Sequence, residues 1–124
     1  MKAITITAQD APAAVGPYCH AKLCGDTLYC SGQLGLVPET GAMAQGLEAQ
    51  ARQALDNLGA ILRAAGMDYS NVVKTTVFLV DMVDFAAVNE IYAQYFSGEV
   101  PARSCVQAVL PKEGLVEVEA IAVK

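Results

Sequence analysis

The feature that most constrains the fold is a run of apolar residues at helical spacing, enclosed by strand-like segments. Between Leu47 and Ala65 apolar side chains recur at intervals of three and four, and Gly66 then supplies a C-terminal cap. The following segment, Val72–Val80, carries apolar side chains on both sides of an extended chain, which is typical of a strand inside a sheet. Together with a strand at Thr27–Ser31, this order predicts parallel strands in one sheet, joined by right-handed crossovers.

The remaining segments extend the same order at both ends. Four further strands are expected from alternation and β-branched composition: Ala3–Thr7, Tyr18–Leu23, Ala102–Leu110 and Leu115–Val123. Gly25 is expected in a tight turn, and Asp84 is expected to cap a second helix that ends near Gly98, with Phe85 on its buried side. The predicted fold class is therefore α/β, or α+β by stricter criteria, with two helices on one face of a sheet. Because the other face lacks cover, we expect a homo-oligomer.

Length and composition narrow the class of protein. A chain of 124 residues holds one core, so residues 1–124 are expected to form a single domain. The hydrophobic fraction of 54% is high for a soluble domain, yet no stretch approaches the roughly 20 apolar residues of a membrane span. We therefore expect no membrane insertion, and we infer that surplus apolar surface packs against another copy of the chain.

Charge and the N-terminal segment argue against two further classes. The net charge of -5 and the lack of a basic run argue against nucleic-acid binding. The first residues alternate apolar and polar side chains and lack the apolar stretch of a secretory signal, so a cytoplasmic location is expected. The 4 cysteines show no C-x-x-C spacing, and we expect reduced, mostly buried thiols.

Metal and cofactor sites find no support in the residue spacing. Cys19 and His20 would point to opposite faces of a strand, and His20 is the single histidine. The chain also lacks the glycine-rich motifs that bind nucleotide phosphates. We predict neither a metal nor a cofactor.

An arginine in an otherwise apolar strand is the first candidate for chemistry. The period of two places Arg103 and Cys105 on one side of the strand, and no acidic residue is adjacent in sequence. Such a guanidinium can pair with a substrate carboxylate in a bidentate contact. It can equally form an ordinary salt bridge or lie at a solvated edge, and the spacing leaves these alternatives open.

Two carboxylates in the last strand are the second candidate. Glu117 and Glu119 share one face, and apolar residues occupy the other. A carboxylate held near another and partly desolvated has a raised pKa and can accept a proton from water near neutral pH. A solvent-exposed polar face would show the same alternation, so the pattern alone does not decide between these readings.

Six segments, taken in order, carry a resemblance to one family: Ala11–Tyr18, Cys30–Gln33, Val73–Phe78, Phe85–Asn89, Pro101–Ser104 and Val116–Ala122. They resemble the Rid (reactive intermediate deaminase, YjgF-like) family, and within it the RidA branch. The resemblance implies a fold like that of Bacillus-type chorismate mutase, with a mixed six-stranded sheet backed by two helices. It also implies a homotrimer with active clefts between subunits.

The resemblance further implies an activity and the roles of particular residues. Enamine and imine intermediates, such as 2-aminoacrylate and 2-iminopropionate, would be hydrolysed to 2-keto acids and ammonia. Arg103 would clamp the substrate carboxylate, Glu117 would hold the attacking water, and Cys105 would contribute through its backbone. The pocket would be lined by four further residues: Tyr18, Ser31, Gly32 and Asn89. The alternative is a non-catalytic trimer that binds keto or amino acids and needs Arg103 but not Glu117.

Overall fold

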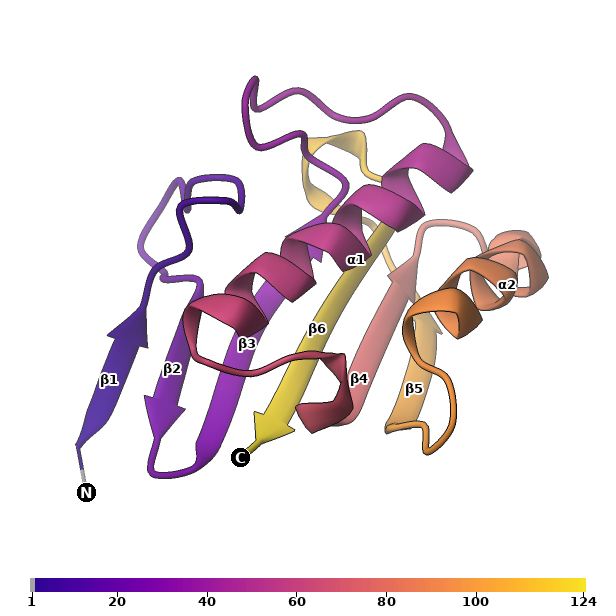
Figure 1. The fold of residues 1–124 in the computed structure, drawn as a ribbon. Coiled ribbons are helices and arrows are strands. Elements are labelled where there is room, and N and C mark those ends of the chain that lie inside the picture. Colours follow the sequence, from indigo (N-terminus) through magenta and orange to yellow (C-terminus); the bar gives the residue numbers. More distant parts are fainter. Residues whose placement is uncertain (1) are drawn as a thin grey trace.

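The computed structural model describes residues 2–124, and these form one mixed sheet with two α-helices on one of its faces (Figure 1). The strands are β1 (Ala3–Ile6), β2 (Ala21–Cys24), β3 (Thr27–Leu34), β4 (Val72–Leu79), β5 (Ala102–Gln107) and β6 (Val116–Val123). The helices are α1 (Leu47–Ala64) and α2 (Phe85–Tyr95), with short 3-10 turns η1 (Tyr69–Asn71), η2 (Met82–Asp84) and η3 (Pro111–Glu113). The sheet order is β1-β2-β3-β6-β4-β5, which confirms the predicted fold class.

The last strand of the chain lies in the middle of the sheet. β6 pairs antiparallel with both β3 and β4, whereas β4 and β5 pair in parallel. β3 and β4 therefore run in the same direction, and α1 connects them across the inserted β6. α2 connects β4 to β5 in the same manner. The two predicted crossovers between parallel strands are confirmed, although only the second joins adjacent strands.

The core lies between α1 and the sheet. Eight of its side chains are almost wholly inaccessible: Leu28, Leu55, Leu58, Ile61, Leu62, Val77, Val116 and Val118. Burial of each such side chain contributes about 1.5 to 3 kcal/mol. α1 ends before Gly66, whose φ of 75° is the left-handed conformation expected of a C-terminal cap. Within the described residues, no helix combines the length and the hydropathy that crossing a membrane requires.

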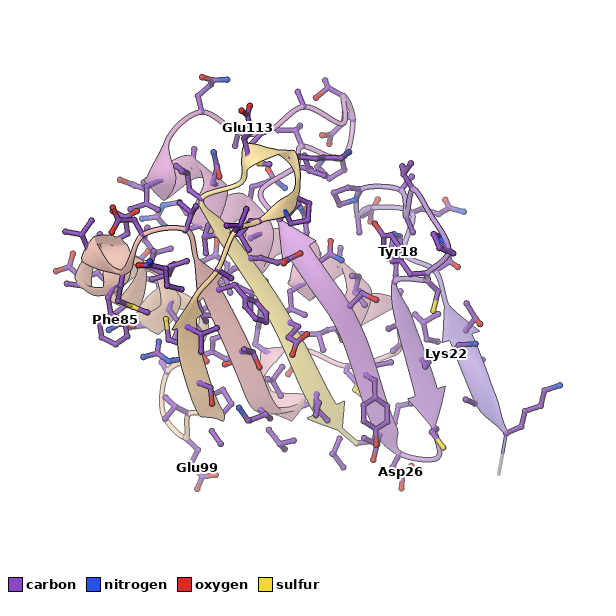
Figure 2. The ribbon with its side chains drawn as sticks, turned by 180° about the vertical axis from the view of Figure 1, so that it is seen from behind. Tyr18, Lys22, Asp26, Phe85, Glu99 and Glu113 are labelled. Atoms are coloured by element: carbon purple, nitrogen blue, oxygen red, sulfur yellow. The ribbon has the colours of Figure 1, made fainter. Side chains whose placement is uncertain are left out.

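The opposite face of the sheet carries no helix (Figure 2). Tyr29 and Val106 on this face are 51% and 42% exposed, and Thr76 and Phe78 are half-buried. Tyr29 and Phe78 lie on inner strands of the sheet, where aromatic side chains are ordinarily covered. The expectation of an uncovered sheet face is therefore confirmed for the part of the chain that the structure describes.

The second predicted strand begins three residues later than expected. The prediction of a strand at Tyr18–Leu23 is wrong for its first half, because β2 starts at Ala21. Gly16 adopts a φ of 133°, and the backbone N–H of Tyr18 donates to the Gly16 carbonyl at 2.9 Å. This tight turn takes Tyr18 out of the sheet and leaves its side chain 54% exposed.

Four further expectations differ from the structure at the ends of elements. A register shift between Val72 and Lys74 buries Val72 and exposes Val73, so the strict alternation predicted across this segment fails at its start. Asp84 precedes α2 but makes no capping hydrogen bond, and Phe85 is 40% exposed rather than buried. The predicted strand from 102 to 110 ends at Gln107.

The cysteines are also less buried than expected. All of them are free, and only Cys30 among those that the structure describes is buried. Burial raises the pKa of the Cys30 thiol to about 12, so this sulfur stays protonated and unreactive.

Candidate active site

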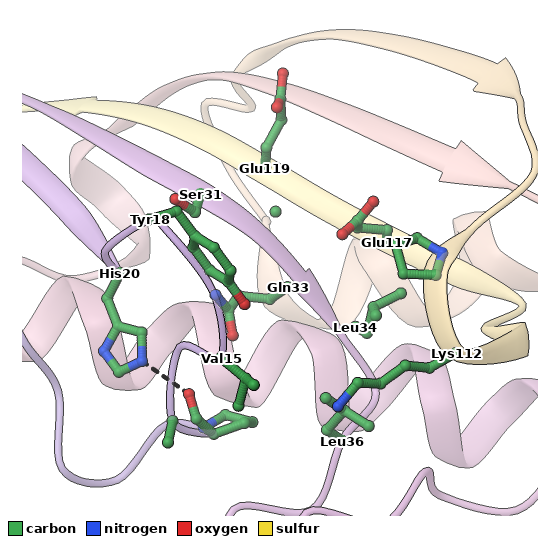
Figure 3. A pocket seen from close by; sticks show the side chains of 14 residues that line it. Val15, Tyr18, His20, Ser31, Gln33, Leu34, Leu36, Lys112, Glu117 and Glu119 are labelled. Carbon is green, nitrogen blue, oxygen red and sulfur yellow. Dashed lines mark hydrogen bonds between the residues drawn. The ribbon is translucent and has the colours of Figure 1, made fainter.

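A cavity of about 580 Å³ opens on the uncovered face of the sheet, where β3 and β6 lie side by side (Figure 3). Four residues that the sequence singled out line it: Tyr18, Ser31, Gly32 and Glu117. Glu119 lines the same cavity. The volume is within the range of small-molecule sites, and the lining combines apolar walls with a few polar groups.

Glu117 is one of the titratable residues that line this cavity. It lies on β6 opposite Leu34 of β3 and Phe78 of β4, and its side chain is half-buried. Desolvation raises the pKa of the Glu117 carboxyl, and the neighbouring charge of Glu119 raises it further. Both effects favour a carboxylate that accepts a proton at a higher pH than an exposed glutamate does.

The wall of the cavity is held by hydrogen bonds from Ser31 and His20. The Ser31 hydroxyl donates to the Cys19 carbonyl at 2.7 Å. His20 Nδ1 accepts from the Ala8 N–H at 2.9 Å, so the ring proton lies on Nε2, which donates to the Pro12 carbonyl at 2.7 Å. The single histidine of the chain is thus a buried structural residue that fixes the loop carrying Tyr18.

Arg103 belongs to a second group of residues, between β5 and α2. Its Nη1 donates to Asn89 Oδ1 at 2.6 Å, and its Cζ lies 4.8 Å from the centroid of the Tyr92 ring and 5.6 Å from that of Phe85. Among the described residues, no acidic side chain forms a salt bridge with this guanidinium. The cation is therefore oriented but carries no counter-charge, which leaves it available for an anionic ligand.

Cys105 lies on the same side of β5 as Arg103. Partial burial raises the pKa of its thiol, and the Arg103 charge opposes that effect. A protonated thiol is a poor nucleophile, so the side chain offers little covalent chemistry.

The two groups of residues lie on opposite faces of the sheet in one chain. Phe78 pairs with Glu117 on one side and with Val106 on the other, so these three residues share a face. Arg103 and Cys105, which alternate with Val106, lie on the other face. In Figure 2, Tyr18 and Phe85 also lie toward opposite edges of the sheet. A single chain thus does not bring the guanidinium to the Glu117 cavity.

Several residues at these positions were missed by reasoning from sequence. Phe85 was expected only on the buried side of its helix and Tyr92 was not singled out, yet both lie on one face of α2 with Asn89, which is four residues after Phe85 and three before Tyr92. Gln33 and Lys112 line the Glu117 cavity. Helical spacing was the one signal in the sequence that could have identified Phe85 and Tyr92, because it places both aromatic side chains on the same helix face as Asn89.

The described residues contain no group of three or more His, Cys, Asp or Glu side chains placed to hold a metal ion. The polar groups of the two clusters are suited to water and to a small organic ligand. A carboxylate of raised pKa can take a proton from water, and a guanidinium without a counter-ion can bind a carboxylate.

The chain is similar over nearly its full length to known proteins. A family described as Endoribonuclease L-PSP matches residues 8–124. A goat (Capra hircus) protein named 2-iminobutanoate/2-iminopropanoate deaminase is 54% identical over 96% of this chain and 88% of its own length. The crystal structure of RidA from an Antarctic Psychrobacter species has a TM-score of 0.95 at 47% identity, covering 98% of this chain and 99% of that one. E. coli TdcF, crystallised with bound serine, has a TM-score of 0.94 at 42% identity and 98% coverage of each chain.

Proposed function

The chain belongs to the endoribonuclease L-PSP family, and from this premise we propose that it hydrolyses reactive 2-imino and 2-enamino acids to 2-keto acids and ammonia. One observation of its structure supports this activity above all others. Glu117 presents a half-buried carboxylate of raised pKa to a cavity of ligand size. Relatives with about half of their residues identical are named for the deamination of 2-iminobutanoate and 2-iminopropanoate.

The proposed reaction needs a positioned water and a proton acceptor. The carbon of a C=N bond is already electrophilic, so most of the acceleration can come from placing the reactants. Glu117 orients a water molecule and takes its proton as the oxygen adds to the imine carbon. The resulting tetrahedral carbinolamine then loses ammonia, with its nitrogen protonated, and leaves the 2-keto acid. Neither a metal nor a cofactor takes part in these steps.

Arg103 is proposed to bind the carboxylate of the substrate. Its fork of donors matches a carboxylate in a bidentate contact, and no described acid neutralises it. Serine, which TdcF binds, has the same α-carboxylate beside a nitrogen atom as the proposed substrates. Tyr18, Ser31 and the Gly32 backbone line the cavity next to Glu117 and would contact the rest of the substrate.

We propose that the complete site forms between copies of the chain in a homotrimer, each copy acting as one domain from residue 1 to 124. The uncovered face of the sheet and the separation of Arg103 from Glu117 support this assembly. The partner copy would bring its Arg103, Cys105 and Asn89 to the Glu117 cavity. Asn89 would thus act beside the guanidinium, which it contacts within its own chain.

Subunit complementation tests both the activity and the composite site. Arg103→Ala and Glu117→Gln are each expected to be inactive when 2-iminopropanoate is generated in situ and its trapping by semicarbazide is followed. Refolding a 1:1 mixture restores about one quarter of wild-type activity, because random assortment pairs an intact Arg103 with an intact Glu117 at that frequency. Activity that stays absent in the mixture, while both variants assemble as the wild type does, contradicts the composite site.

The same observations support two other functions less well. A sensor that binds keto or amino acids without turnover needs Arg103 but has no use for a carboxylate of raised pKa in its cavity. Cleavage of RNA, which the family description names, requires attraction to a phosphate backbone. The net charge of -5 and the two glutamates that line the cavity oppose it. We further propose a cytoplasmic location, since the free cysteines suit a reducing compartment.

A further inference from the structure

Side chains of α2 hold the guanidinium of Arg103 in place within its own chain. Three residues on one face of α2 contact it: Phe85, Asn89 and Tyr92. Asn89 accepts one hydrogen bond, whereas Phe85 and Tyr92 present aromatic rings to the cation. The Tyr92 ring is the nearer, at 4.8 Å, and lies within the range of a favourable cation–π contact.

Tyr92 differs from Phe85 in being fixed. Its side chain is buried, whereas Phe85 is 40% exposed. The Tyr92 hydroxyl shares a hydrogen bond of 2.7 Å with Thr75 Oγ1, and Thr75 is 0% exposed. The ring also packs against Phe96, with centroids 4.6 Å apart. It therefore has little freedom to follow movements of the cation.

The position of Thr75 links this anchor directly to the arginine. Thr75 of β4 and Arg103 of β5 are register partners in the parallel pair. β4, which carries the anchoring Thr75, therefore also forms the backbone hydrogen bonds with β5, which carries Arg103. Burial raises the pKa of the Tyr92 hydroxyl, while Thr75 and the Arg103 charge oppose that effect, so the group stays a neutral phenol.

We propose that Tyr92 is a positioning residue for Arg103: its ring, anchored through its hydroxyl to Thr75, holds the guanidinium in the orientation that binds the substrate carboxylate. The inference rests on the proposed function, in which Arg103 is the carboxylate clamp. An unsupported arginine side chain samples many rotamers, and ordering it on binding weakens affinity. Tyr92 removes that loss before the ligand arrives.

Kinetics on Tyr92→Leu measure this role. The variant loses the ring, so KM for the imine and the dissociation constant of pyruvate, a 2-keto acid, are expected to rise about 5- to 30-fold. kcat changes less than about threefold, because the contact is present in the ground state and in the transition state alike. Tyr92→Phe keeps the ring and is expected to retain most of the affinity, with a rise of about threefold or less.

Tyr95→Leu is the matched control on the same helix. Tyr95 is half-buried, its hydroxyl donates to Asp56 Oδ1 at 2.8 Å, and its ring lies 5.6 Å from that of Tyr69. Among the described residues, it is in neither the hydrogen bond nor the cation–π contacts of Arg103. Its replacement should lower the melting temperature without raising KM, which separates lost packing from lost positioning.

A neutral ligand isolates the charge interaction. Pyruvamide lacks the carboxylate, so Tyr92→Leu should weaken its binding far less than that of pyruvate. Thr75→Val keeps the Tyr92 ring and the packing volume but removes the hydrogen bond that anchors the ring. This variant replaces Tyr92→Leu in the test if Tyr92→Leu fails to assemble. A measurable rise in the pyruvate dissociation constant, with kcat retained, is expected for it too.

The inference is overturned if Tyr92→Leu binds pyruvate with the same affinity as Tyr95→Leu. If Tyr92→Leu does not assemble, an unchanged pyruvate affinity of Thr75→Val overturns the inference instead. Arg103→Ala is measured alongside. If that variant binds pyruvate like the wild type, the proposed carboxylate clamp is wrong, and the role of Tyr92 is lost with its premise. If Arg103→Ala loses binding and Tyr92→Leu does not, only the positioning role fails.

Discussion

Gly32 lies so close to Glu117 that a Cβ atom at position 32 would meet Glu117 Oε2 at 2.8 Å and Cδ at 2.9 Å. Real Cβ atoms do not approach other atoms this closely, so a larger residue must move the carboxylate. The absence of a side chain at position 32 therefore sets the place of the proposed proton acceptor.

Gly32→Ala is expected to lower turnover about 10- to 100-fold by displacing the Glu117 carboxylate from the water it would hold. The fold should survive, because the contact is with the end of a side chain rather than with backbone. The semicarbazide assay measures the loss. In a Glu117→Gln background the same substitution should cost little more, and a fully additive loss in the double variant would show that Gly32 acts elsewhere.

Glu117→Gln keeps the shape of the side chain but cannot accept a proton. Imine hydrolysis is expected to fall about 10²- to 10⁴-fold, while calorimetry shows binding of a 2-keto acid largely retained. Glu119→Gln is the matched control, because it removes a neighbouring carboxylate of the same cavity. If Glu119→Gln abolishes hydrolysis and Glu117→Gln does not, the proton acceptor is Glu119; if neither changes it, the sensor function is favoured.

The raised pKa of Glu117 predicts how stability depends on pH. The pKa of Glu117 in the folded protein lies above 4.5, the ordinary value that it has in the unfolded chain. In the pH window between these two pKa values, the folded chain therefore binds more protons than the unfolded chain. Stability of the wild type should therefore decrease as the pH rises through the window. Glu117→Gln lacks this effect and should melt higher than the wild type at pH 7.5, with the gap closing toward pH 4.

Thermal unfolding at a series of pH values checks this prediction. Glu99→Gln, at an exposed loop position, controls for the loss of one negative charge. A gap between wild type and Glu117→Gln that is constant with pH, or that matches the Glu99→Gln gap, contradicts a raised pKa at Glu117.

Arg103→Ala should abolish binding of carboxylate ligands, so affinity and turnover fall together. Removal of the guanidinium leaves a ligand carboxylate without a charged partner in a partly desolvated site. Arg103→Lys should recover only part of the binding, because an ammonium group keeps the charge and loses the planar fork. Calorimetric titration with a 2-keto acid distinguishes the three proteins, and equal affinity in all of them rules out the clamp.

Chelation should leave the activity intact, because neither the spacing of candidate ligands nor the proposed steps involve a metal. The measurement is the imine assay before and after exhaustive dialysis against a chelator. Loss of activity that a single metal ion restores would contradict the proposed chemistry.

Local sequence patterns were sufficient to predict the helices and strands whose side chains recur at a regular spacing. The helical run ending before Gly66 and the β-α-β order follow from side-chain spacing, which local backbone geometry dictates. The pairing of Arg103 with Cys105 on one side of a strand follows from the period of two in the same way. Family resemblance, carried by short motifs, supplied the proposed roles of the pocket residues.

Only the tertiary structure decided which of these residues meet. The insertion of β6 between β3 and β4 is a long-range pairing with no local signal, and it places Glu117 beside Gly32 in one cavity. The position of α2 beside β5 brings Tyr92 beneath the Arg103 guanidinium, a contact that side-chain spacing within either element does not predict. Side-chain spacing determines which face a residue occupies, whereas strand order and helix packing determine which residue faces it.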